Sequence, residues 1–111
     1  MEKNSEVVID GRTYRAISIL EKGEKVIDIK ELKRRAIKWN ALKTEREADR
    51  AYREQRDGIP NSLSEFNIIF SEWCTNSNPY YLDFSNYHKY WFFGSNKEQS
   101  FNDSFLFLVP K

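Results

Sequence analysis

The sequence predicts an α+β fold: an antiparallel sheet built from an N-terminal three-stranded meander and C-terminal aromatic strands, with two or three central helices. Three observations support this fold class. Apolar and polar residues alternate around an Asp-Gly turn near the N-terminus, helical spacings with capping signals follow between residues 28 and 74, and the aromatic residues concentrate after residue 62. A chain of 111 residues has the size of one domain, so we expect residues 1–111 to fold as a single unit.

The first element is a β-hairpin. Asp10-Gly11 provides the two positive-φ positions that a type I′ turn needs, and it separates the expected strands 7–9 and 12–17. The turn predicts that Ile9 faces Arg12 and Val7 faces Tyr14. This register is self-consistent, because it places the apolar side chains on one side of the hairpin. A second turn at residues 21–24 leads to a short strand at 25–27, which completes the meander.

Residues 28–56 predict a long, charged helix. Asp28 and Glu31 have capping-box spacing at its start. The apolar stripe of the first half does not continue into the second half, and another capping pair, Thr44 with Glu47, stands where the stripe changes side. The pattern favours a kink or a short break near Thr44, although a continuous helix is also compatible with it.

A second helix is expected over residues 63–74. Gly58 and Pro60 end the preceding helix, and a capping box at residues 62–65 precedes the new one. Its apolar positions recur at helical spacing and form the richest stripe in the chain, so we expect this to be the principal core helix. The stripe consists of Leu63, Phe66, Ile69, Phe70 and Trp73.

The remaining residues predict strands at about 80–84, 87–93 and 104–109. The last of these, Phe105–Val109, is apolar on both faces. A strand of this kind normally lies in the centre of a sheet, because both of its faces must be covered. We therefore expect the C-terminal strand to be an inner strand.

Composition excludes several classes of protein. A net charge of +1 draws the whole chain neither to nucleic acid nor to a membrane. No apolar run approaches a membrane span, no signal peptide is recognised, and the single cysteine, Cys74, suits a reducing compartment. One histidine and one cysteine cannot form a structural zinc site, and the four glycines are scattered. We expect a cytoplasmic protein with no metal, no cofactor and no membrane association.

His88 is the only candidate for catalysis. With Asp83 and Lys89 nearby, it can support a small metal-independent ribonuclease in which these groups move protons and stabilise charge. Its place in an expected strand among aromatic residues is more typical of a sheet surface. We therefore expect no catalytic residue and no enzymatic activity, and a ribonuclease is the third and weakest of our hypotheses.

The strongest basic cluster lies on the first helical segment. A helix can present several cations on one exposed face, where they contact phosphates. A nucleic-acid-binding accessory protein is therefore the alternative function. The residues of this face are Lys30, Lys33, Arg34, Arg35 and Lys38.

The favoured function is a small non-catalytic binding protein that modulates a macromolecular partner, most plausibly a protein. Residues 44–56 are rich in charge and poor in apolar residues, so we expect a helical arm that contributes little to the core. The predicted partner-binding residues are Ala48, Tyr52 and Arg53, and the same helix offers a route to a homo-oligomer. The Asn-, Lys- and aromatic-rich composition suits an AT-rich phage or mobile element that encodes a regulator or inhibitor of its host.

Overall fold

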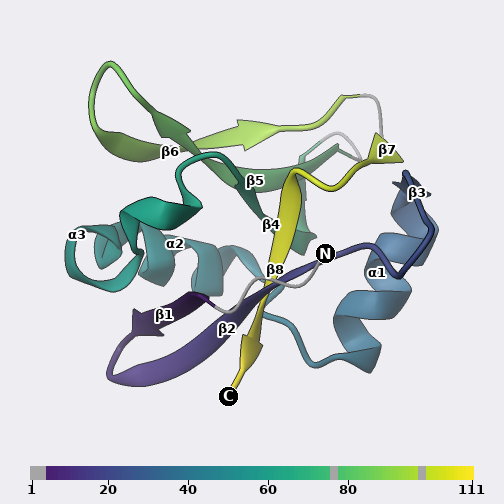
Figure 1. The fold of residues 1–111 in the computed structure, drawn as a ribbon, viewed down its shortest axis with the longest axis horizontal. Coiled ribbons are helices and arrows are strands. Elements are labelled where there is room, and N and C mark those ends of the chain that lie inside the picture. The colour runs from purple at the N-terminus through teal and green to yellow at the C-terminus, as the bar shows by residue number, and fades with distance from the viewer. Residues whose placement is uncertain (1–4, 76–77, 98–99) are drawn as a thin grey trace.

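The computed structural model describes residues 5–75, 78–97 and 100–111. These residues form a curled, mostly antiparallel sheet that combines strands from both ends of the chain, with helices between them in sequence (Figure 1). The predicted α+β fold class is therefore confirmed.

All the helices lie between the third and fourth strands in the sequence. The strands are β1 (Ser5–Ile9), β2 (Arg12–Ser18), β3 (Ile27–Asp28), β4 (Asn67–Thr75), β5 (Asn78–Ser85), β6 (Tyr90–Ser95), β7 (Ser100–Phe101) and β8 (Phe105–Pro110). The helices are α1 (Ile29–Lys38), α2 (Glu45–Arg53) and α3 (Gln55–Gly58), followed by a short 3-10 helix, η1 (Asn61–Leu63).

The N-terminal hairpin has the predicted register. Val7 pairs with Tyr14 and Ile9 with Arg12, and Asp10 and Gly11 occupy the turn with φ of 57° and 76°. The third strand forms at Ile27–Asp28, but it pairs with β7 in a separate two-stranded sheet. The position beside β2 is taken by β8, which is apolar on both faces and therefore competes better for the centre of the sheet.

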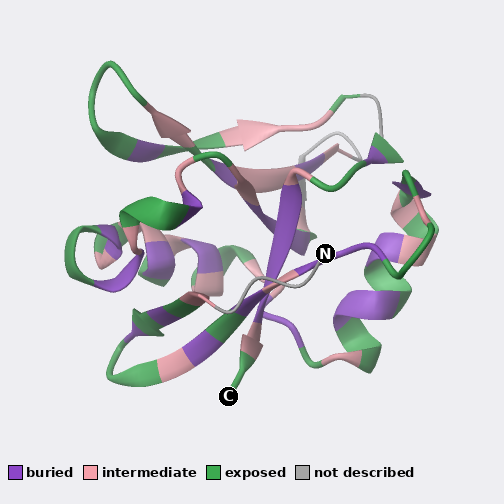
Figure 2. Cartoon of the chain, viewed as in Figure 1, coloured by how far each residue is buried: buried purple, intermediate pink, exposed green. Residues whose placement is uncertain are grey.

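The main sheet has the strand order β1-β2-β8-β4-β5-β6. Its pairs are antiparallel except β4–β8, which is parallel. The prediction that the C-terminal strand is an inner strand is confirmed, and β8 is buried along most of its length in the centre of Figure 2. Leu106 and Leu108 face one hydrophobic cluster, whereas Phe105 and Phe107 face the other. The sheet thus has a core on each side.

The expected helix over residues 63–74 is wrong, because this segment forms η1 and then β4. Ile68 and Phe70 point into one core and Ile69 into the other, so alternate residues are buried on opposite faces of an inner strand. Phe70 is fully buried as expected, whereas Phe66 and Trp73 are only partly buried. A short continuous apolar run fits a buried helix and a buried strand equally well, so its period did not decide between them.

The long charged segment is broken where the second capping signal stands. Helix α1 ends at Lys38, Asn40 adopts a positive φ of 56°, and α2 starts at Glu45 with a complete capping box between Thr44 and Glu47. The break has a structural consequence: α1 packs in the core on one face of the sheet and α2 in the core on the other. The change of side in the apolar stripe therefore marks the point where the chain crosses the sheet.

Helix α3 connects the two outer strands of the curled sheet, β1 and β6. On the β6 side, the buried Gln55 side chain accepts a hydrogen bond from the Trp91 N–H (2.5 Å) and donates one to the Trp91 carbonyl (3.2 Å). On the β1 side, a Cβ added at Gly58 would overlap the Val8 carbonyl oxygen. A side-chain amide and a glycine thus let one turn of helix cover both sheet edges, which would otherwise offer unpaired backbone groups.

Candidate functional site

Arg35 does not belong to an exposed basic face, contrary to the sequence prediction. Its side chain is buried, with the residue 4% exposed, and it lies between the loop before α1 and the helix itself. The guanidinium donates to both Glu24 carboxylate oxygens (2.6 Å each), to Glu31 (2.7 Å) and to the Ile19 carbonyl (2.9 Å). Arg35 is therefore a structural residue that fastens the loop to the helix, because all of its directions are occupied by acceptors.

The ion pairs of Arg35 with Glu24 and Glu31 make the stability of the protein depend on pH. Hydrogen bonds from Arg35 lower the pKa of Glu24 to about 2, and those from Arg34 and Arg35 lower the pKa of Glu31 to about 2, from an ordinary 4.5. Because these folded-state pKa values lie below the unfolded ones, the stabilisation is present above pH 4.5 and is lost as the pH falls towards 2.

We therefore predict that the melting temperature falls between pH 5 and pH 2 and that Arg35→Met lowers it at pH 7 while flattening this part of the profile. Thermal unfolding of both proteins at unit pH steps measures the effect. Parallel profiles for the two proteins would contradict the assignment, because the acid sensitivity would then come from other carboxylates.

The rest of the predicted basic face is smaller than the sequence suggests. Arg34 is exposed but pairs with Glu31 at 2.5 Å. Lys30, Lys33 and Lys38 are exposed on α1. Three lysines therefore remain for contacts with phosphates, in place of the five cations predicted.

Helix α2 is not a projecting arm. Ala48 and Ala51 are 0% exposed and belong to the core of one sheet face, so the prediction that this segment contributes little to the fold is wrong. Small side chains let a helix approach a sheet closely. The two alanines of α2 can therefore pack against the sheet although they contribute few apolar atoms. Ala48 has no exposed surface for a partner, whereas Tyr52 is half-buried and Arg53 is exposed and paired with Asp49 at 2.8 Å.

His88 lies in the turn between β5 and β6, since β6 begins only at Tyr90. Its backbone N–H donates to the Ser85 hydroxyl (3.2 Å), and Lys89 closes the turn with a φ of 56°. The His88 ring is exposed and contacts the rings of Tyr87 and Phe92. Cys74 lies in β4, but its side chain is outside the described part of the structure.

An exposed aromatic surface follows the β5–β6 hairpin. Tyr87 is 90% exposed, Phe92 is 40% exposed and Tyr90 is similar to Phe92. Ring contacts run from Tyr87 to His88, from His88 to Phe92 and from Phe92 to Tyr90, with centroids 4.9, 5.4 and 5.6 Å apart. These four residues are called the aromatic ribbon below. Tyr52 of α2 adjoins the ribbon, because its ring lies 5.6 Å from that of Tyr90.

A basic cavity of about 370 Å³ lies beside the ribbon, between α3 and the hairpin turn. Arg56, His88 and Lys89 line it together with the aromatic residues Phe84, Tyr90 and Trp91, and no carboxylate of the described residues does. The cavity therefore offers positive charge next to an apolar surface. Sequence reasoning did not identify it, because Arg56 and the hairpin turn are far apart in the chain.

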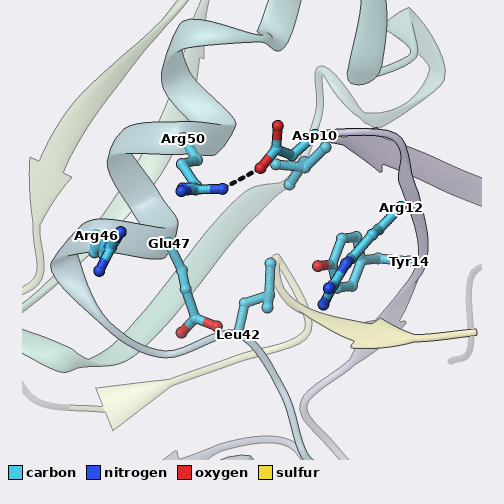
Figure 3. Close-up of a pocket in the computed structure, with 8 residues that line it drawn as sticks. Asp10, Arg12, Tyr14, Leu42, Arg46, Glu47 and Arg50 are labelled. Atoms are coloured by element: carbon cyan, nitrogen blue, oxygen red, sulfur yellow. Dashed lines mark hydrogen bonds and ion pairs between the residues drawn. The ribbon is translucent and has the colours of Figure 1, made fainter.

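A second basic cleft, of about 300 Å³, lies between α2 and the β1–β2 hairpin (Figure 3). Arg46 and Arg50 reach it from α2, while Arg12 and Tyr14 reach it from β2. Its other lining residues are Ile9, Asp10, Leu42 and Glu47. The sequence shows that Arg46 and Arg50 share a helix face, at i and i+4, and that Arg12 and Tyr14 share a strand face, at i and i+2. It does not show that these two faces meet, because that depends on the tertiary structure.

No three His, Cys, Asp or Glu side chains among the described residues form a group that could hold a metal ion. No helix in that part of the chain is long and apolar enough to cross a membrane. The sequence matches no protein-family model, and no curated protein and no solved structure matches it either.

Proposed function

We propose that this is a small, non-catalytic cytoplasmic binding protein that modulates a protein partner, and that the partner docks on the aromatic ribbon. One observation carries the proposal: the large aromatic side chains that are exposed in the described structure, Tyr87, Tyr90, Phe92 and Phe93, all fall within seven consecutive residues of one hairpin. The composition, typical of an AT-rich genome, supports a phage or mobile-element regulator as the context.

A contiguous group of aromatic rings exposed to water is energetically unfavourable unless a partner buries it. Exposed apolar side chains are normally scattered singly on a monomer, whereas contiguous patches mark sites of interaction. Tyr and Phe are also enriched at the centres of protein interfaces, because they bury a large area at a small cost in side-chain entropy. The ribbon therefore has the chemistry of an interface.

The charges around the ribbon favour a protein over a nucleic acid. Asp83 stands directly opposite Phe92 in the β5–β6 register, so a phosphate backbone following the rings would meet a carboxylate. The adjoining cavity presents Arg56 and Lys89 without a carboxylate. A protein segment with apolar residues for the ribbon and one acidic residue for this cavity matches both features. Tyr52 lies at the edge of the same surface, and it and the exposed Arg53 of the same helix remain candidate contacts.

The double variant Tyr87→Ser with Phe92→Thr is predicted to lower partner recovery at least about tenfold, because each ring of an interface centre typically contributes more than 1 kcal/mol. Its melting temperature should stay within a few degrees of the wild type, since both side chains are exposed. The measurement is recovery of a defined protein in a pull-down from host lysate, combined with photo-crosslinking from a benzoylphenylalanine at position 87.

Ile37 provides the matched control, because it is an exposed apolar residue on α1, away from the ribbon. Ile37→Thr and a crosslinker at position 37 should leave recovery unchanged and produce no adduct. Equal recovery by the ribbon variant would contradict the proposal. Recovery that disappears after nuclease treatment would instead favour the nucleic-acid alternative on Lys30, Lys33 and Lys38, which are the exposed lysines of α1.

A further inference from the structure

The cleft between α2 and the β1–β2 hairpin gathers hydrogen-bond donors from two directions. Figure 3 shows Arg46 and Arg50 on the helix side and Arg12 beside Tyr14 on the strand side, with Leu42 at the base between them. A ligand between the two walls can therefore receive hydrogen bonds from opposite sides. A flat surface cluster of cations cannot provide this geometry.

Several of these donors are not used within the protein. In the described structure Arg12 and Arg46 form no ion pair, whereas Arg50 pairs with Asp10. Tyr14 is more than nine-tenths buried, at 9% exposed, and its hydroxyl has no hydrogen-bond partner among the described residues. The hydroxyl oxygen itself is not buried, and it points into the cleft (Figure 3). A bound acceptor can therefore receive its hydrogen bond.

The two carboxylates of the cleft are already in use. Glu47 accepts hydrogen bonds from the backbone N–H groups of Lys43 (2.9 Å) and Thr44 (3.0 Å) and from the Thr44 hydroxyl (3.0 Å). Although burial opposes it, these bonds hold the pKa of Glu47 below its ordinary value, so it remains an anion engaged with the loop. Asp10 is engaged by Arg50. The unused groups are therefore two cations and one hydroxyl.

We infer that this cleft binds the phosphate group of a small phosphorylated molecule. A phosphate monoester carries a charge of about −1.5 to −2 at pH 7, which matches the two unpaired guanidiniums. Its oxygens are arranged tetrahedrally and can accept from Arg12 and Tyr14 at once, while Arg46 on the opposite wall adds positive charge. A planar carboxylate, by contrast, is satisfied by a single guanidinium fork. A volume of about 300 Å³ is at the lower end for ligand pockets, which limits the ligand to a small molecule.

The site does not depend on the proposed protein-binding function, and calorimetry on the full chain tests it directly. The probes are inorganic phosphate and glycerol phosphate, compared with acetate and chloride at equal ionic strength. We expect a Kd on the order of 1 mM for phosphate. Arg12→Gln and Arg46→Gln should each weaken binding about tenfold or more, and Tyr14→Phe about fivefold, as expected for charged and neutral hydrogen bonds.

Asp10→Asn is the decisive variant, because it should improve binding. Asparagine is favoured at a positive-φ turn position, so the hairpin is preserved while Arg50 loses its competing carboxylate. Phosphate should then bind about three- to fivefold more tightly, a gain that misfolding cannot produce. Arg53→Gln on the same helix removes an equal charge outside the cleft and should leave the Kd unchanged.

Three results would overturn the inference. One is an unchanged Kd in the Arg12 and Arg46 variants, and another is equal binding of acetate or chloride, since both would indicate a general ionic effect. The third is a short DNA duplex that binds through the same arginines much more tightly than glycerol phosphate, because the phosphate would then belong to a nucleic acid.

Discussion

Replacing Phe70 with alanine is expected to lower the free energy of unfolding by about 3–5 kcal/mol. Phe70 is among the largest fully buried side chains of the described structure, and it lies on β4, an inner strand of the sheet. It packs in the same core as Ala48 and Ala51 of α2, so its loss opens a cavity between sheet and helix. Nearby side chains on both elements are too constrained to fill that space.

Urea unfolding followed by circular dichroism measures this loss. Because small domains have total stabilities of about 5–15 kcal/mol, Phe70→Leu serves as a milder variant, with an expected cost of less than about 1.5 kcal/mol, if the alanine variant does not fold. Phe92→Ala is the matched control, since the same side chain is removed from an exposed position of β6. A loss below about 1 kcal/mol for Phe70→Ala would show that β4 is not packed as described.

Replacing Gly58 with alanine is expected to lower the free energy of unfolding by about 3 kcal/mol. The added methyl group would overlap the Val8 carbonyl oxygen, which is backbone and cannot rotate away. Helix α3 would have to move away from β1, and this would disturb the Gln55 hydrogen bonds that hold it to β6. Intrinsic helix propensity alone predicts the opposite sign, with alanine favoured by about 1 kcal/mol.

Gly23→Ala separates steric overlap from backbone strain. Gly23 has a φ of +87° and no atom within 4 Å of an added Cβ, so its replacement should cost only about 1–2 kcal/mol for the left-handed conformation. Thermal and urea unfolding of both variants provide the comparison. A neutral or stabilising Gly58→Ala would mean that α3 is not in close contact with β1.

The candidate surfaces show how far local reasoning extends. Tyr52 and Arg53 were predicted from the charge pattern of one helix; the Tyr52 ring contacts that of Tyr90, whereas Arg53 is exposed and paired with Asp49. Ala48 and Arg35 were predicted by the same reasoning and are buried. A pattern along one helix identifies which residues share a face, but it does not show what covers that face.

Local signals were sufficient wherever a few neighbouring residues decide the conformation. Asp10-Gly11 determined the turn and register of the first hairpin, and Thr44 with Glu47 determined the start of α2. Phe105–Val109 is apolar on both faces, and this predicted its inner position in the sheet, because both faces of such a strand must be buried. In each case the dominant interaction lies within a few residues or follows directly from burial.

Only the tertiary structure decided the elements that depend on distant partners. Residues 67–75 became a strand because β5 and β8 supply its backbone partners, and an apolar run alone does not specify that choice. β3 pairs with β7 because β8 occupies the place beside β2. The cleft between α2 and the β1–β2 hairpin likewise exists only because α2 packs on the face of the sheet that carries Tyr14. Contacts between residues far apart in the chain determine these features, and no local pattern encodes which distant segments will meet.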